Sequence, residues 1–264
     1  MTLPKIALTR VSKAYGAGAL AVAEVSLSVA AGAFVALVGG SGSGKTTTLK
    51  MINGLISPDQ GEIRVDGALI TEVAPPVLRR RIGYVFQEVG LFPHLTVAEN
   101  IAITPKLLGW PPAQRAARVD ELLDQVGLPR AFASRAPAAL SGGQRQRVGV
   151  ARALAARPGL MLMDESFGAL DPVTRDTLGG DYRRLHDALG LTTVMVTHDM
   201  TEAVLLADQI VVMAGGRIIA QGAPAALAVS DDPEVRALID TPRRQAQRVQ
   251  ARLAQVRQDQ GAGA

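Results

Sequence analysis

The stretch Gly39-Gly40-Ser41-Gly42-Ser43-Gly44-Lys45-Thr46 decides the fold because of what stands on either side of it. Before it, Phe34 to Val38 is a continuous apolar run that ends at glycine, which is typical of a strand buried on both faces. After it, Lys45 to Asn53 predicts a helix that stops at Gly54. Strand, glycine-rich loop and helix in this order are the setting that a phosphate-binding loop requires.

The loop fits the Gly-x4-Gly-Lys-Ser/Thr pattern, in which each residue type has a physical task. Glycines let successive backbone N–H groups turn toward one anion, and the following helix adds its positive N-terminal end. We expect Lys45 to reach the β- and γ-phosphates of ATP and Thr46 to place its hydroxyl on Mg²⁺. The alternative is a merely flexible Gly/Ser loop, which the flanking strand and helix disfavour. The expected nucleotide-binding residues of the loop are Gly39, Gly40, Ser41, Gly42, Ser43, Gly44, Lys45, Thr46 and Thr47.

A second apolar run, Leu160 to Met163, ends in two carboxylates, Asp164 and Glu165. With a phosphate loop upstream, we expect Asp164 to hold Mg²⁺ through water, and Glu165 to orient or deprotonate the water that attacks the γ-phosphate. The alternative for Asp164 is a helix cap that follows a strand.

A third segment, Leu140-Ser141-Gly142-Gly143-Gln144, lies far down the chain at the start of a predicted helix, Ser141 to Ala156. Serine and two glycines at a helix start make a second anion-binding element, with Ser141 as the expected N-cap. The alternative is an ordinary serine-capped helix.

Together the three segments resemble the ATPase subunit of ATP-binding cassette (ABC) transporters. The resemblance implies an α/β fold of the P-loop NTPase (RecA-like) type. Its mostly parallel sheet carries an N-terminal antiparallel β-subdomain and an inserted α-helical subdomain at about 96–156. It also implies a head-to-tail dimer that sandwiches two ATP molecules, with the phosphate loop of one copy facing Ser141 and Gly143 of the other.

Four single residues match family positions. By resemblance, Gln87 touches Mg²⁺ or the attacking water and His198 contacts the γ-phosphate. Tyr15 stacks on adenine, and Asp171 belongs to a loop that crosses the dimer contact. The alternatives are a polar loop residue for His198 and a packed N-terminal tyrosine for Tyr15. The chain departs from the family at Ser166 and Gly40, where proline is common; we expect little chemical consequence, although the stiffness of the loop after Glu165 changes.

Within the family, Ile82 to His94 and Asn100 to Trp110 resemble importers of quaternary amines, the glycine betaine, carnitine and choline group. The expected function is therefore ATP hydrolysis that powers solute import. The alternatives are an importer for another solute, an exporter, a soluble ABC protein acting on nucleic acid or ribosomes, and a non-hydrolysing regulator. Glu165, Gln87 and His198 disfavour the regulator, and a single phosphate loop without a heptad run disfavours the soluble protein.

Composition is compatible with this interpretation. The 264 residues allow one large domain with an appendage, which we place at 1–237 and 238–264. There is no cysteine, which fits a reducing compartment. Met1 to Arg10 does not resemble a signal peptide, and the uncharged stretch Val25 to Gly44 does not resemble a membrane span. We therefore expect a peripheral protein on the cytoplasmic face of the inner membrane. Its expected partners are integral membrane permease subunits and a substrate-binding protein, with no nucleic acid.

The tail from Pro242 to Gln258 is basic and has an apolar residue every three or four positions, which predicts an amphipathic helix. The apolar positions are Ala246, Val249, Leu253 and Val256. The stripe can pack on its own domain, pair with another copy or lie near anionic lipid; we expect it to pack on the domain. Gly261 to Ala264 should fray.

Overall fold

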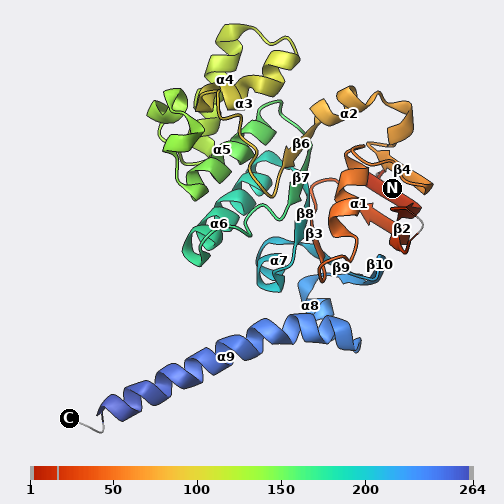
Figure 1. Ribbon diagram of the computed structural model, residues 1–264, viewed down its shortest axis with the longest axis vertical. Helices are drawn as coiled ribbons and strands as arrows, with labels where there is room; N and C mark the ends of the chain where they lie inside the picture. The colour runs from red at the N-terminus through yellow and green to blue at the C-terminus, as the bar shows by residue number, and fades with distance from the viewer. Residues whose placement is uncertain (1–2, 17, 262–264) are drawn as a thin grey trace.

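Two sheets form the body of the protein in the computed structural model, which describes residues 3–16 and 18–261, with side chains as far as Arg252 (Figure 1). The smaller sheet is antiparallel, in the order β2-β1-β4-β5. Its strands alternate buried and exposed residues, as expected where one face is solvated. The strands are β1 (Ile6–Ala14), β2 (Leu20–Val29), β4 (Gln60–Val65) and β5 (Ala68–Leu69).

The larger sheet has six strands in the order β10-β9-β3-β8-β7-β6, and the pairs from β9 to β6 are parallel. β3, β6, β7 and β8 are buried along their whole length. The strands are β3 (Phe34–Val38), β6 (Ile82–Val85), β7 (Leu160–Asp164), β8 (Thr192–Thr197), β9 (Gln209–Ala214) and β10 (Arg217–Gly222). The predicted fold class is confirmed.

Strand β3 divides the core in two because its side chains alternate. Phe34 and Val38 pack on one side with α6 (Pro172–Leu189) and α7 (Met200–Leu206), whereas Val35 and Leu37 pack on the other with α1 (Lys45–Ile52) and the antiparallel sheet. The period of two in a strand produces this division.

The inserted helices form a separate green and yellow group beside the sheet (Figure 1). They are α3 (Val97–Leu107), α4 (Pro112–Gln125) and α5 (Gly142–Leu154), with short 3₁₀ turns at Arg130–Ser134, Pro137–Ala139 and, outside this group, Ile70–Glu72. A further helix, α2 (Pro75–Arg81), precedes β6 directly.

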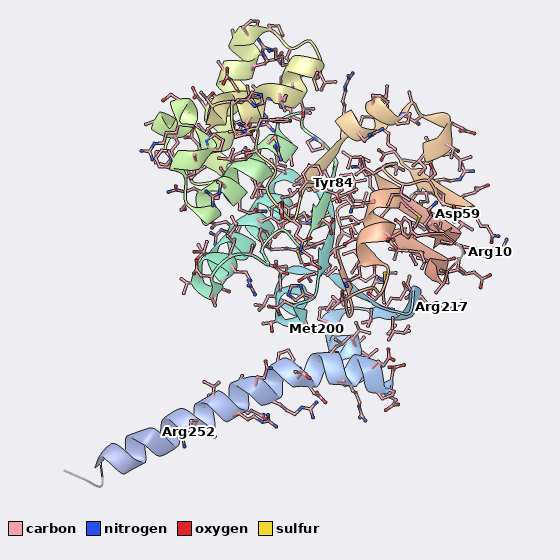
Figure 2. All side chains as sticks on the ribbon, in the orientation of Figure 1. Arg10, Asp59, Tyr84, Met200, Arg217 and Arg252 are labelled. Carbon is pink, nitrogen blue, oxygen red and sulfur yellow. The ribbon has the colours of Figure 1, made fainter. Side chains whose placement is uncertain are left out.

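The C-terminal region consists of α8 (Pro224–Leu227) and the long helix α9 (Pro233–Gly261). Val235 and Ile239 are buried against the core, but from Arg243 to Arg252 the side chains are exposed and Val249 is 58% accessible. The helix projects away from the body, with Arg252 far along it (Figures 1 and 2). Packing of this tail on its own domain is therefore wrong for Ala246 and Val249, since four arginines in this part favour water over a core. The side chains of Leu253 and Val256, and the end at 262–264, lie outside the described residues.

Among the residues that the structure describes, no helix has both the length and the hydropathy to cross a membrane.

Candidate active site

The phosphate loop joins the end of β3 to the start of α1, and its backbone requires glycine at two positions. Gly39 has φ +154° and Gly44 has φ +98°. A Cβ added at Gly39 would lie 2.1 Å from the carbonyl oxygen of Met213, and one at Gly44 would lie 2.4 Å from that of Ala21. Neither position can accept a larger residue without a backbone shift, so the loop shape is built into the sequence.

Lys45 turns back over this loop. Its Nζ donates hydrogen bonds to the carbonyl oxygens of Gly39 and Gly40, both at 2.8 Å, and to the Ser43 hydroxyl at 3.2 Å. Burial lowers the pKa of the ammonium group, while the carboxylates of Glu165 and Asp164 act in the opposite direction. The cation thus lies at the mouth of the loop, facing the two carboxylates.

The expected magnesium ligands contact one another. The Thr46 hydroxyl donates to Asp164 Oδ1 at 2.8 Å, and the Tyr84 hydroxyl donates to Asp164 Oδ2 at 3.2 Å. Within the described residues there is no cluster of three or more His, Cys, Asp or Glu side chains that could hold a metal by themselves. One hydroxyl beside one carboxylate nevertheless fits Mg²⁺, which keeps several of its waters and takes its other ligands from phosphate.

Two polar side chains from neighbouring strand ends lie against the Glu165 carboxylate. Gln87 Nε2 donates to Glu165 Oε2 at 3.1 Å, and His198 Nδ1 lies 3.4 Å from the same oxygen. Gln87 follows β6, Glu165 follows β7 and His198 follows β8, so the carboxyl ends of three adjacent parallel strands meet here. The structure therefore brings together the three residues for which the sequence predicted catalytic roles.

The residue after Glu165 makes a contact that the sequence does not reveal. Ser166 is 4% exposed, and its hydroxyl donates to the carbonyl oxygen of Val85 at 3.3 Å. A proline at this position would have no group to donate.

The segment Leu140 to Gln144 leads into α5, and the predicted cap at Ser141 is confirmed. Ser141 Oγ accepts from the Gln144 amide at 3.3 Å, and Gln144 Oε1 accepts from the Ser141 amide at 2.9 Å, which is a complete capping box. A Cβ at Gly143 would lie 2.7 Å from Thr174 Cγ2, so a larger residue there would require the Thr174 side chain to move. Figure 1 shows α5 and α1 on opposite sides of strands β6 to β8, so one chain does not bring this segment to its own phosphate loop.

Two further predicted residues lie at the edge of this region. Tyr15 is 54% exposed, so its side chain is open to a ligand, and adenine stacking stays a prediction. Asp171 caps α6 by accepting from the Thr174 amide at 3.0 Å. The Thr174 hydroxyl, and after it this amide, lower the pKa of the Asp171 carboxyl group.

Sequence reasoning missed Tyr84 and the pair formed by Arg175 and Asp199. Arg175 lies 3.3 Å from Asp199 and donates to the carbonyl oxygens of Gly168 and Leu170, which holds the loop that carries Asp171. Asp199 also caps α7. An acidic residue between a predicted strand and a predicted helix is a cap signal by which the sequence could have identified it. Tyr84 lies near the middle of the molecule in Figure 2, and no sequence pattern marked it.

A fold with this phosphate loop, acidic strand end and separate capped glycine segment defines a nucleotide-binding cassette. Residues 22–168, more than half of the chain, match the profile of a family described as "ABC transporter". The chain belongs to the ABC transporter family, as the resemblance predicted.

Individual relatives extend this finding. The choline transport ATP-binding protein OpuBA of Bacillus subtilis is 52% identical over 219 residues, which are 83% of this chain and 58% of that protein. The glycine betaine uptake system ATP-binding protein YehX of Escherichia coli is also 52% identical, over 83% of this chain and 71% of YehX. Among solved structures, the ATP-binding cassette MJ0796, a dimer bound to ADP and Pi in a post-hydrolysis state, is 34% identical. Its TM-score is 0.75, over 83% of this chain and 98% of that one.

Proposed function

We propose that this chain is the ATP-hydrolysing subunit of an ABC importer that drives uptake of quaternary amines such as glycine betaine or choline. The observation that carries the proposal is the convergence of Gln87 and His198 on the Glu165 carboxylate, on the same sheet edge as Lys45 and Asp164. A protein that only bound nucleotide would not need this arrangement.

The geometry supports a division of labour during hydrolysis. Lys45 leaves the loop carbonyls and binds the β- and γ-phosphates, while the loop N–H groups and the start of α1 hold the remaining charge. Glu165 accepts the proton of the attacking water, and the Gln87 amide orients the carboxylate. His198 lies beside Glu165 and contacts the γ-phosphate. Thr46 and Asp164 would hold Mg²⁺, which when bound neutralises charge that develops on the phosphate oxygens.

Hydrolysis on this proposal requires a second copy of the chain. Ser141 and Gly143 lie at the start of α5, away from α1, so they complete the site of a partner in a head-to-tail dimer (Figure 1). The dimeric relative MJ0796 supports this arrangement, because its bound nucleotide belongs to a dimer.

The permease subunits fit a groove of about 530 Å³ that is lined by α2, β6, α3, α5 and the residues that follow α1. Its walls include the exposed apolar side chains Leu55, Phe86, Phe92 and Leu107. Phe86 is the neighbour of Gln87, so an inserted segment would act directly on the residue that touches Glu165. On this proposal the protein works at the cytoplasmic face of the inner membrane, and a substrate-binding protein delivers the solute on the other side.

The substrate class rests on the names of the relatives. OpuBA and YehX, both 52% identical to this chain, are named for choline and glycine betaine transport. The membrane and binding-protein subunits select the solute, so the chain's own residues support the class only through that similarity.

Two measurements test the proposal in sequence. The purified chain should hydrolyse ATP, and Glu165→Gln should bind ATP as the wild type does while its turnover falls by at least about a hundredfold, as expected on removal of a general base. Wild-type turnover by Glu165→Gln would remove the assigned role. The complex that co-purifies with the tagged chain should then import glycine betaine or choline in vesicles; transport of a different solute would leave the ATPase role intact and overturn the substrate class.

A further inference from the structure

The pairing between strands β6 and β7 ends just before the residues proposed for hydrolysis. The last paired residues are Val85 of β6 and Met163 of β7. Beyond them the segment after β6 leads to Gln87, and the segment after β7 leads to Glu165. Where the backbone ladder stops, the Ser166 hydroxyl supplies one more link by donating to the Val85 carbonyl oxygen at 3.3 Å. This link lies two residues before Gln87 and one residue after Glu165.

The backbone of Glu165 is held on its other sides as well. Its amide donates to the Val196 carbonyl oxygen of β8 at 2.9 Å, and its own carbonyl oxygen accepts from the Gly168 amide at 3.1 Å. Its φ is +44°, in the left-handed region, which a residue other than glycine adopts only when its surroundings impose it. The Ser166 hydroxyl is therefore the side-chain part of a set of contacts that holds a strained residue in place.

A proline at position 166 would change this arrangement in two ways. It has neither a hydroxyl nor an amide hydrogen to donate, and it biases the preceding residue toward extended backbone. Glu165 has the opposite backbone conformation here. Serine at this position thus fits the conformation of Glu165 in this chain.

We infer that Ser166 is a positioning residue, whose bond to Val85 keeps the Gln87 amide and the Glu165 carboxylate within hydrogen-bonding reach during ATP hydrolysis. The inference rests on the proposed function. Gln87 Nε2 and Glu165 Oε2 are 3.1 Å apart across the point where the strands separate, so a small movement of β6 against β7 would break that contact. Misplacement of a catalytic group by about 1 Å can cost about a hundredfold in rate.

The test compares two buried serines that both bond to the main chain. Ser166→Ala removes the link beside Glu165. Ser12→Ala is the matched control, because Ser12 is also 4% exposed and accepts from the Glu24 amide at 2.9 Å, in the antiparallel sheet. Ser166→Thr keeps a hydroxyl and serves as the rescue. For each full-length variant, kcat, KM for ATP, ATP affinity and Tm are measured.

We expect Ser166→Ala to lower kcat about five- to tenfold, which corresponds to one lost hydrogen bond. Its KM and ATP affinity should stay within about twofold of the wild type, a change smaller than the loss of one hydrogen bond causes. Ser12→Ala should lower Tm by about as much as Ser166→Ala does and keep the wild-type kcat. Ser166→Thr should regain most of the turnover that Ser166→Ala loses. If Ser166→Ala does not fold, Ser166→Cys replaces it, because a thiol is nearly the same shape but a weak donor.

Three outcomes overturn the inference. Turnover by Ser166→Ala at the wild-type rate removes the positioning role while leaving the proposed function in place. Equal losses of kcat in Ser166→Ala and Ser12→Ala would show a general effect of stability. A wild-type chain that binds ATP without hydrolysing it would overturn the proposed function, and the positioning role with it.

Discussion

Gln87 and Glu165 lie 78 positions apart in sequence, yet the amide of one donates to the carboxylate of the other at 3.1 Å. Gln87 follows Phe86, which lines the groove proposed for the permease, whereas Glu165 follows Asp164, the residue proposed to hold magnesium. This single hydrogen bond therefore joins the groove to the nucleotide site.

Replacing Gln87 by alanine should uncouple these two regions. The Glu165 carboxylate loses its orienting donor, so we expect kcat to fall at least about tenfold, the lower end of the range for one hydrogen bond to a charged group. ATP affinity should change little, because Lys45 and the loop amides are untouched. Steady-state kinetics and nucleotide titration separate the two effects, and a variant with full kcat and weakened ATP binding would contradict the assignment.

Lys45→Ala should weaken ATP binding itself, in contrast to changes at Glu165. Loss of a buried cation that bonds to charged phosphate should lower affinity about ten- to a hundredfold. Lys50→Ala is the control, since Lys50 lies in the last turn of the same helix. Calorimetric titration with a non-hydrolysable ATP analogue measures both, and equal affinities for the two variants would end the assignment of Lys45 to phosphate.

His186 should make the fold sensitive to acid. It is 1% exposed, and its Nδ1 lies 2.9 Å from the Thr193 hydroxyl. Burial, reinforced by the Arg183 cation, lowers its pKa from the ordinary 6.5. The unfolded chain therefore binds a proton below about pH 6.5 that the folded chain does not, so this residue makes the free energy of unfolding fall as pH falls below that value.

Urea unfolding of wild type and His186→Gln between pH 5 and 7.5 checks this prediction, over a range of roughly one unit either side of an ordinary histidine pKa. Acidification should destabilise the variant less than it destabilises the wild type. His94→Gln, at an exposed position, should keep the wild-type slope. Equal slopes for His186→Gln and the wild type would show that His186 does not titrate with unfolding.

The sequence predicted the parts of this site that depend on local pattern. The phosphate loop has a fixed spacing, and the apolar runs before Gly39 and Asp164 mark strands that are buried on both faces. The cap at Ser141 follows from its neighbour Gln144 at the third helical position. In each case the residues that impose the structure lie next to one another in the chain.

What the sequence did not predict depends on contacts between distant segments. Tyr84 and Ser166 contact Asp164 and Val85 across neighbouring strands, and nothing adjacent to them signals this. Strand β10 is different, because the Gly215-Gly216 pair has φ values of +53° and +78° and closes a hairpin with β9. A Gly-Gly pair between two apolar runs is a hairpin signal, so this strand could have been found.

Ser141→Arg should separate ATP binding from ATP hydrolysis, because Ser141 serves the site of the partner copy. The phosphate loop of the same chain is untouched, so ATP affinity should stay within about twofold of the wild type, less than the loss of one hydrogen bond would cause. Turnover should fall at least about a hundredfold, since an arginine at the start of α5 obstructs the dimer and removes the hydroxyl. Part of any effect could come from the lost helix cap, which costs about 1 kcal/mol.

Thr96→Ala isolates that contribution. Thr96 forms the same kind of capping box with Glu99 at the start of α3, in the same group of helices. We expect Thr96→Ala to lose a similar amount of thermal stability and to keep its turnover. Mixing inactive Ser141→Arg with inactive Lys45→Ala extends the test. The mixed dimer holds one site in which the phosphate loop of one copy and the segment from Leu140 to Gln144 of the other are both intact. Partial recovery of hydrolysis in the mixture is the expected result, and full activity of Ser141→Arg by itself would show that each chain completes its own site.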